Sequence, residues 1–253
     1  MLYPVSPLSF AVLAPLRAAP MISRASLAPL SPAPGLPSDG AWWRELLGRP
    51  GERSALAIAF AWNVLTLAAM YMVMPVRGAF LLTNFGPEVI PYVYMASAAA
   101  TGLAVALYGS FARRSRSRLV GGTILALSAC LLGWWAVGNV ASTVPAVAFA
   151  FYLWSDVFSI MSVTVFWSYA DDVFRGERSK RLFGVIAAAG SLGAILGSLL
   201  VNRLVVALGP LPMLLMAAAT YSMALPLLWA LERWARSLPK ARAAPAETRP
   251  RSP

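Results

Sequence analysis

Six long runs of apolar residues, separated by short polar stretches, organise most of the chain. Each has about the 20 residues that an α-helix needs to cross a bilayer at a rise of about 1.5 Å per residue. The runs cover residues 55–76, 89–111, 119–138, 144–167, 183–208 and 211–231. The first is expected to contain a kink at Pro75 and either to end at Val76 or to continue to Leu82. The strict alternation of membrane barrel strands is not found. The pattern therefore predicts an all-α membrane protein with six transmembrane helices.

Composition agrees with this pattern. Of the 253 residues, 59% are hydrophobic and only 12% are charged, whereas soluble proteins carry about 25% charged residues. The missing charge is concentrated between the apolar runs. An ordinary water-soluble domain is therefore excluded, and a polytopic membrane protein is expected.

The net charge of +11 is placed almost entirely on alternate connections of the predicted helices. The opposite connections, LLTNFGPE, NVAST and GPLP, contain no Lys or Arg. Basic loops stay in the cytoplasm, so both termini are predicted to be cytoplasmic, in a bacterial inner (plasma) membrane. This placement also argues against nucleic acid as a partner. The basic residues concerned are Arg44, Arg49, Arg53, Arg113, Arg114, Arg116, Arg118, Arg175, Arg178, Lys180, Arg181, Arg233 and Arg236.

The segments outside the apolar runs define the expected domain organisation. Residues 1–40 are rich in Pro and Ala and are predicted to be a disordered tail. Residues 41–53 indicate a short amphipathic juxtamembrane segment with Trp42 and Trp43 at the membrane surface. Residues 54–232 form the six-helix transmembrane domain, and residues 233–253 form a basic, disordered cytoplasmic tail.

One acid, Asp156, stands about twelve residues into the fourth run. Insertion of Asp at the centre of a membrane helix costs about 2.5–3.5 kcal/mol, so such residues usually face a bundle interior or a wet cavity. On a helix, Asp156 shares a face with Tyr152 and Trp167. Two interpretations remain open, a residue on a solute path and a structural polar anchor bonded to a neighbouring helix.

Arg77 ends the hydrophobic part of the first run, just after Pro75. Asn63 lies on roughly the same helical face. Arg77 could pair with Asp156, present its guanidinium to an anionic solute, or extend to the membrane surface. The sequence does not decide among the three.

Asp171 and Asp172 lie at the cytoplasmic end of the fourth run and could be taken for the metal-binding acids of a membrane transferase. DDVFR lacks a third acid, however, and the chain has no His and no second acidic motif. We therefore expect no enzyme activity, no metal and no cofactor. The two acids are instead predicted to form ion pairs with Arg178, Lys180 or Arg181 in the loop.

The segment GSLGAILG in the fifth run lacks the spacing and the Lys-Ser/Thr ending of a phosphate-binding loop. Gly193 and Gly197 instead form a GxxxG pair, and Gly190 extends this small-residue surface. Such residues let helix backbones approach closely within a membrane. Close helix packing is the first prediction, and the lining of a solute path is the alternative.

Two stretches, FYLWSDVFSIMSVTVFWSYADDVF and RSKRLFGVIAAAGSLGAILG, resemble the ATP/ADP antiporter-like (nucleotide carrier) branch of the major facilitator superfamily. The similarity extends over residues 55–231, and YMVMPVRGAF looks like the RPVRD-type segment of that branch. Met74 stands where that pattern usually has its first arginine, and Gly78 where it usually has an acid.

The resemblance implies a fold of two six-helix halves that bind the solute between them near the midplane. This chain would correspond to the N-terminal half, and its partner would be a second six-helix half, from another copy or a separate chain. In the family, a basic residue late in the first span and an acid in the fourth handle the substrate, and Arg77 and Asp156 match those positions.

These observations predict a half-transporter that moves a small solute by alternating access, with a nucleotide (ATP/ADP) or another anionic metabolite as the solute. The surface of Gly193 and Gly197 is predicted to dock the second half. The alternative is a non-transporting membrane scaffold or sensor with the same fold. The candidate substrate-binding residues are Arg77, Asp156, Asn63, Tyr152 and Trp167.

Overall fold

The computed structural model describes residues 50–111, 116–174 and 179–237. The chain divides into two units, Met1–Trp42 and Trp43–Pro253, and every described residue belongs to the second. The predicted N-terminal tail, juxtamembrane residues 41–49 and the tail from residue 238 lie outside the described residues.

Helices account for nearly all of the described residues, and no strand occurs among them. Six stretches are long and apolar enough to cross a membrane, with α7 and α8 together forming the last. The six membrane-length helices predicted from the apolar runs are therefore confirmed. The elements are α2 (Pro50–Asn84), the 3₁₀ helix η2 (Pro87–Val89), α3 (Ile90–Phe111), α4 (Arg116–Ala141), α5 (Pro145–Val173), α6 (Ser179–Leu208), α7 (Pro212–Ser222) and α8 (Ala224–Ser237).

The first membrane helix, α2, continues through Pro75 to Asn84, so it follows the longer of the two predicted courses. Proline has no N–H, so the carbonyl of Tyr71 loses the hydrogen bond that residue 75 would normally donate. The ring of Pro75 is exposed, on the outside of the helix. The helix accommodates the proline without interruption.

The sixth apolar run is one span in length but two helices in structure. The break lies at Met223, whose N–H still donates to the carbonyl of Ala219. Pro226 follows three residues later and cannot donate to the carbonyl of Ser222. We attribute the end of α7 at Ser222 to this missing donor.

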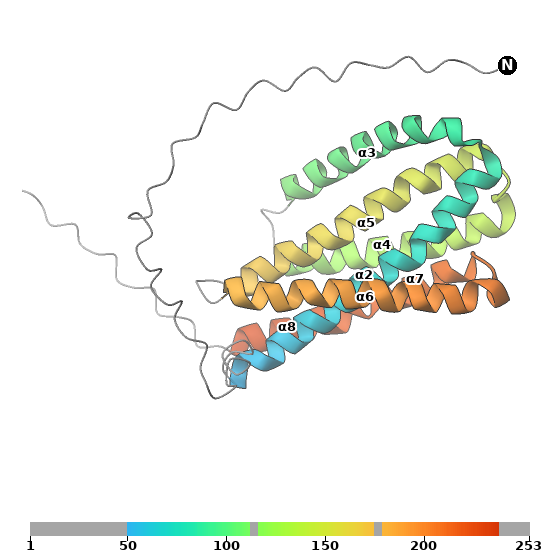
Figure 1. Ribbon diagram of the computed structural model, residues 1–253. Helices are drawn as coiled ribbons and strands as arrows, with labels where there is room; N and C mark the ends of the chain where they lie inside the picture. Colours follow the sequence, from blue (N-terminus) through green and yellow to red (C-terminus); the bar gives the residue numbers. More distant parts are fainter. Residues whose placement is uncertain (1–49, 112–115, 175–178, 238–253) are drawn as a thin grey trace, which may run out of the picture. The chain divides into compact units, whose positions relative to one another are not determined.

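Helix α2 is the centre of the packing. It contacts α5, α6, α7 and α8, whereas α3 packs against α5 and η2 and lies at the edge of the bundle (Figure 1). Aromatic rings fill much of the core. The ring of Phe151 has its centroid 5.3 Å from that of Phe80 and 5.2 Å from that of Trp134, which ties α5 to α2 and α4.

The outward faces of the bundle are also apolar. Met95 is 74% exposed on α3 and Val206 is 91% exposed on α6. A helix that is apolar all round suits a lipid surrounding rather than water. The described residues are thus consistent with an integral, multi-pass membrane protein.

The glycines of α6 meet α2 within the same chain. A side-chain carbon at Gly193 would overlap the carbonyl oxygen of Val64, and one at Gly197 would lie 2.5 Å from that of Ala68. Gly190 is looser, with 3.2 Å between the same position and Nδ2 of Asn63. The prediction of close packing is confirmed for Gly193 and Gly197.

The docking of a second half on this surface stays a prediction, but its two most closely packed glycines already have a neighbour within the chain. Gly193 and Gly197 are buried, and the backbone of α2 occupies the space beside them. A GxxxG pair signals that some backbone approaches closely, but it does not say which one. Here the close partner is the chain's own first membrane helix.

Candidate functional site

Arg77 of α2 and Asp156 of α5 form an ion pair, in which Nη1 of Arg77 donates a hydrogen bond to Oδ1 of Asp156. Asp156 is eleven residues from the start of α5, about 16 Å along its axis, and Arg77 is seven residues, about 10 Å, from the end of α2. The pair therefore lies inside two predicted spans rather than at their ends. It joins the first span to the fourth.

Tyr152 adds an aromatic face to this pair. It precedes Asp156 by one helical turn on α5, and its ring centroid lies 4.7 Å from the guanidinium carbon of Arg77. A cation over an aromatic face gains about 0.5–2 kcal/mol, with the larger values where water is excluded. Arg77 is thus held on α5 by a carboxylate and a ring that follow each other on one helical face.

Tyr94 of α3 completes the cluster. Its ring meets that of Tyr152 edge-on, with 6.4 Å between the centroids. Tyr94 is largely exposed, whereas Tyr152 is buried. Three different membrane helices therefore converge around one arginine.

The other hydroxyl groups of α5 near this cluster are satisfied within their own helix. Ser155 donates to the carbonyl of Tyr152, Ser159 to that of Ser155, and Ser162 to that of Ser159. Serine commonly bonds back to its own helix in this way. Unlike these serines, Asp156 reaches another helix with its polar group, as it bonds to Arg77 of α2.

The ion pair of Arg77 and Asp156 is partly buried. The side chain of Arg77 is 17% exposed and that of Asp156 is 21% exposed. Each charge keeps an opposite partner, which offsets the cost of taking it out of water. At the same time each has an accessible face, so an anion can compete with the carboxylate for the guanidinium. The arrangement can exchange one partner for another.

Two of the predicted substrate-binding residues lie elsewhere. Asn63 is fourteen residues from Arg77, about 21 Å along α2, and its Nδ2 donates to the carbonyl of Ile186 on α6, 2.7 Å away. Trp167 is eleven residues from Asp156, about 16 Å along α5, and its ring packs edge-on against Phe183. The structure places both at contacts between α6 and its neighbours, apart from the ion pair.

Tyr94 is the member of the cluster that sequence reasoning missed. Because tyrosine is uncharged, its insertion into a membrane helix costs little free energy, so its presence in an apolar run does not mark a functional residue. Its place near the start of the second span is the one available clue. Because Arg77 lies late in the first span, the two residues are at similar depth in neighbouring spans.

Only some residues of the predicted loop ion pairs are among the described residues. Arg178 lies outside the described residues, as do the side chains of Lys180 and Arg181. Asp171 is exposed at the end of α5, and Asp172 is half-buried and has an interaction partner. The pairing of these acids with the loop stays a prediction.

In residues 50–111, 116–174 and 179–237, no three His, Cys, Asp or Glu side chains come together in a way that could hold a metal ion. The free cysteine Cys130 is exposed on α4. An outward position in a lipid-facing helix suits a small, weakly polar thiol.

The chain matches no protein-family model, no curated protein and no solved structure.

Proposed function

We propose that this chain transports a small solute across the membrane by alternating access and that the ion pair of Arg77 and Asp156 lies on the solute path. The observation that carries this proposal is the pair itself, placed inside two spans and partly exposed. Charged residues at such depth commonly mark substrate or proton pathways.

The chemistry of the pair favours an anionic solute. A guanidinium offers several donors in one plane, which fits a carboxylate or phosphate group. An incoming anion would take over the place of the Asp156 carboxylate beside Arg77. Tyr152 would keep the guanidinium in position meanwhile, because its ring packs on the face of the cation. Release of Asp156 from α2 would then loosen the contact between α2 and α5.

The solute class follows from this single cation together with the resemblance to nucleotide carriers. We propose ATP/ADP or a smaller anionic metabolite. Met74, in place of an arginine, leaves one positive charge at this point of α2 instead of two. A solute with fewer negative charges than ATP would therefore be matched at least as well.

Transport by alternating access also needs a second half. Facilitator-type carriers bind the solute between two six-helix units that rock about the site. We propose that a second copy of the chain, or a separate six-helix chain, supplies this unit. The basic loops orient the chain with both termini in the cytoplasm, which for a bacterial protein implies the inner membrane.

Uptake into proteoliposomes tests the proposal. Vesicles containing the full chain, alone and with any six-helix chain that co-purifies, are loaded with ADP and supplied with labelled ATP or a panel of labelled anionic metabolites. We expect uptake by the wild type and a loss of at least about tenfold in Asp156→Asn and Arg77→Gln, because about 1.4 kcal/mol of lost interaction already gives tenfold.

Asp171→Asn is the matched control. It removes an acid from the same helix, at its exposed cytoplasmic end, and should leave uptake unchanged. Folding is checked in each variant by the thermal midpoint of the purified protein. No uptake under any partner condition, or equal uptake by Asp156→Asn and wild type, would refute the proposal. The first of these results would favour the scaffold or sensor alternative.

A further inference from the structure

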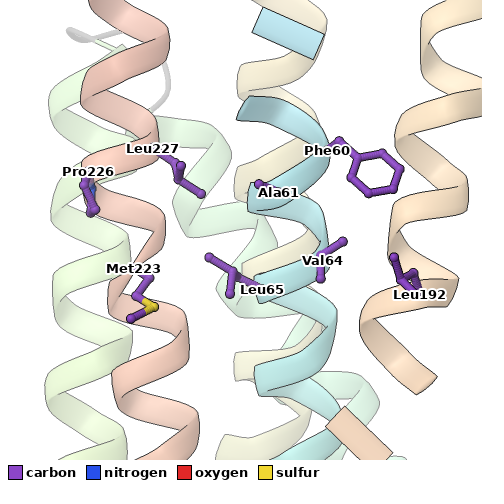
Figure 2. Close-up of a pocket in the computed structure, with 8 residues that line it drawn as sticks. All are labelled: Phe60, Ala61, Val64, Leu65, Leu192, Met223, Pro226 and Leu227. Carbon is purple, nitrogen blue, oxygen red and sulfur yellow. The ribbon is translucent and has the colours of Figure 1, made fainter. Parts of the chain in front are cut away.

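A pocket of about 590 Å³ lies between α2, α6 and α8, remote from the ion pair. Figure 2 shows α2 between the other two helices, with Phe60 and Leu192 on one side and Met223 and Leu227 on the other. The lining side chains are carbon and sulfur only, so the pocket suits a hydrocarbon rather than a polar solute. The lining residues are Phe60, Ala61, Val64, Leu65, Leu192, Met223, Pro226 and Leu227.

Two arginines lie beyond one end of this pocket, one on α2 and one on α8. Arg53 is seven residues before Phe60 on α2, and Arg233 is seven residues after Pro226 on α8. Seven residues make nearly two turns, so each arginine shares the face of its lining residue about 10 Å farther along the axis. Both are exposed. Since α2 begins and α8 ends at the same end of the bundle (Figure 1), both reach one membrane surface.

The position of Arg233 is supported by its neighbour. Its guanidinium carbon lies 4.5 Å from the ring centroid of Trp229, which is itself 59% exposed. Tryptophan collects at the level of the lipid headgroups. The ring therefore holds the cation beside a residue type that is common at headgroup level, about 10 Å along α8 from the lining residue Pro226.

We propose that this pocket binds one anionic phospholipid, with an acyl chain against Val64, Leu192 and Met223 and the phosphate near Arg53 and Arg233. The apolar pocket matches the acyl chain of such a lipid, and the positive charge beyond its end matches the phosphate. Basic pockets between membrane helices on the cytoplasmic side bind anionic headgroups. A helix from a second chain would cover the arginines and cost the desolvation of both. Arg53 also has an interaction within the chain, so Arg233 is the principal cation for the phosphate; the adjacent Glu232 lies 3.4 Å from Arg236.

Native mass spectrometry of the full chain tests this directly. The protein is reconstituted in nanodiscs of equal parts phosphatidylcholine and phosphatidylglycerol and released, and the lipids that stay bound are counted. We expect one retained phosphatidylglycerol per chain. Arg233→Gln should lower the preference for phosphatidylglycerol over phosphatidylcholine about fivefold, since a basic residue near an anionic lipid surface contributes about 1 kcal/mol.

Two further variants separate charge from packing. Arg118→Gln removes one exposed positive charge at the start of α4, on the same membrane surface but away from the pocket, and should keep the preference. Ala61→Phe fills the pocket and should abolish retention of either lipid. An unchanged preference in Arg233→Gln, no retained lipid in the wild type, or dimers that Ala61→Phe alone disrupts would each overturn the proposal. The last result would identify a second copy as the occupant.

Discussion

Replacing Gly193 with alanine is expected to destabilise the bundle by separating its two most closely packed helices. The added carbon would overlap the carbonyl of Val64 and lie 2.9 Å from the Val64 Cα. These are backbone atoms of α2, which cannot rotate aside as the end of a flexible side chain can. Accommodation therefore requires α2 and α6 to move apart as rigid helices.

The magnitude follows from two opposing terms. Overpacking of a well-filled contact costs about 1–3 kcal/mol. Alanine gains up to about 1 kcal/mol over glycine in a helix interior. The variant Gly184→Ala measures the helix-propensity gain alone, because Gly184 lies on the same helix and a side-chain carbon there meets nothing within 4 Å. We expect Gly193→Ala to be less stable than Gly184→Ala by about 2 kcal/mol, near the middle of the overpacking range.

The assay is reversible unfolding of the purified chain in mixed micelles, followed by tryptophan fluorescence as sodium dodecyl sulfate is added. The free energy of unfolding is compared among wild type, Gly193→Ala and Gly184→Ala. Equal values for the two variants would refute the reasoning. If Gly193→Ala unfolded like Gly184→Ala but lost crosslinking to a second chain, the predicted docking role of this surface would be supported.

The same unfolding assay checks three further predictions. Phe151→Ala should lower the free energy of unfolding by about 3–5 kcal/mol, because a fully buried ring that contacts three other aromatic side chains is lost. A decrease of less than about 1 kcal/mol would contradict the packing described. Asn63→Leu should cost about 0.6–2 kcal/mol through its lost bond to α6, whereas Asn139→Leu, which loses only a bond within its own helix, should be near neutral. The double variant Arg77→Met/Asp156→Leu should be as stable as wild type or more so yet transport nothing; transport by this variant would remove the pair from the solute path.

The number and length of the helices could be predicted because the cost of exposing backbone groups to lipid forces each apolar run into a helix. The neighbours of each helix could not. A helix that is apolar on every face gives no sign of which face packs inward, so the sequence does not reveal that α2 is central while α3 is peripheral. The division of the sixth run at Met223 was also missed, although Pro226 was its visible cause.

For the candidate site too, some features could be predicted from the sequence and others could not. Pairing of Arg77 with Asp156 was one of three interpretations that the sequence left open, and it is the one that the structure shows; two opposite charges inside a membrane each need a partner. Tyr152 could be placed beside Asp156 by helical register alone. Asn63 and Trp167 share approximate faces with these residues but lie too far along their helices to join them. The helical register predicts the direction in which a side chain points around its helix. It does not predict which residues of two neighbouring helices lie at the same depth, which only the fold determines.

The contacts around α2 bear on what the ion pair is for. Helix α2 is already held by backbone contact with α6 at Gly193 and Gly197 and by the ring contact of Phe80 with Phe151 on α5. Neither contact involves Arg77 or Asp156. A pair whose only task was to join α2 to α5 would add little to these, and an apolar pair of similar volume would join them as well without the cost of desolvating two charges. We therefore propose that this charged pair, which keeps part of each side chain exposed, is a contact between α2 and α5 that opens during the proposed transport.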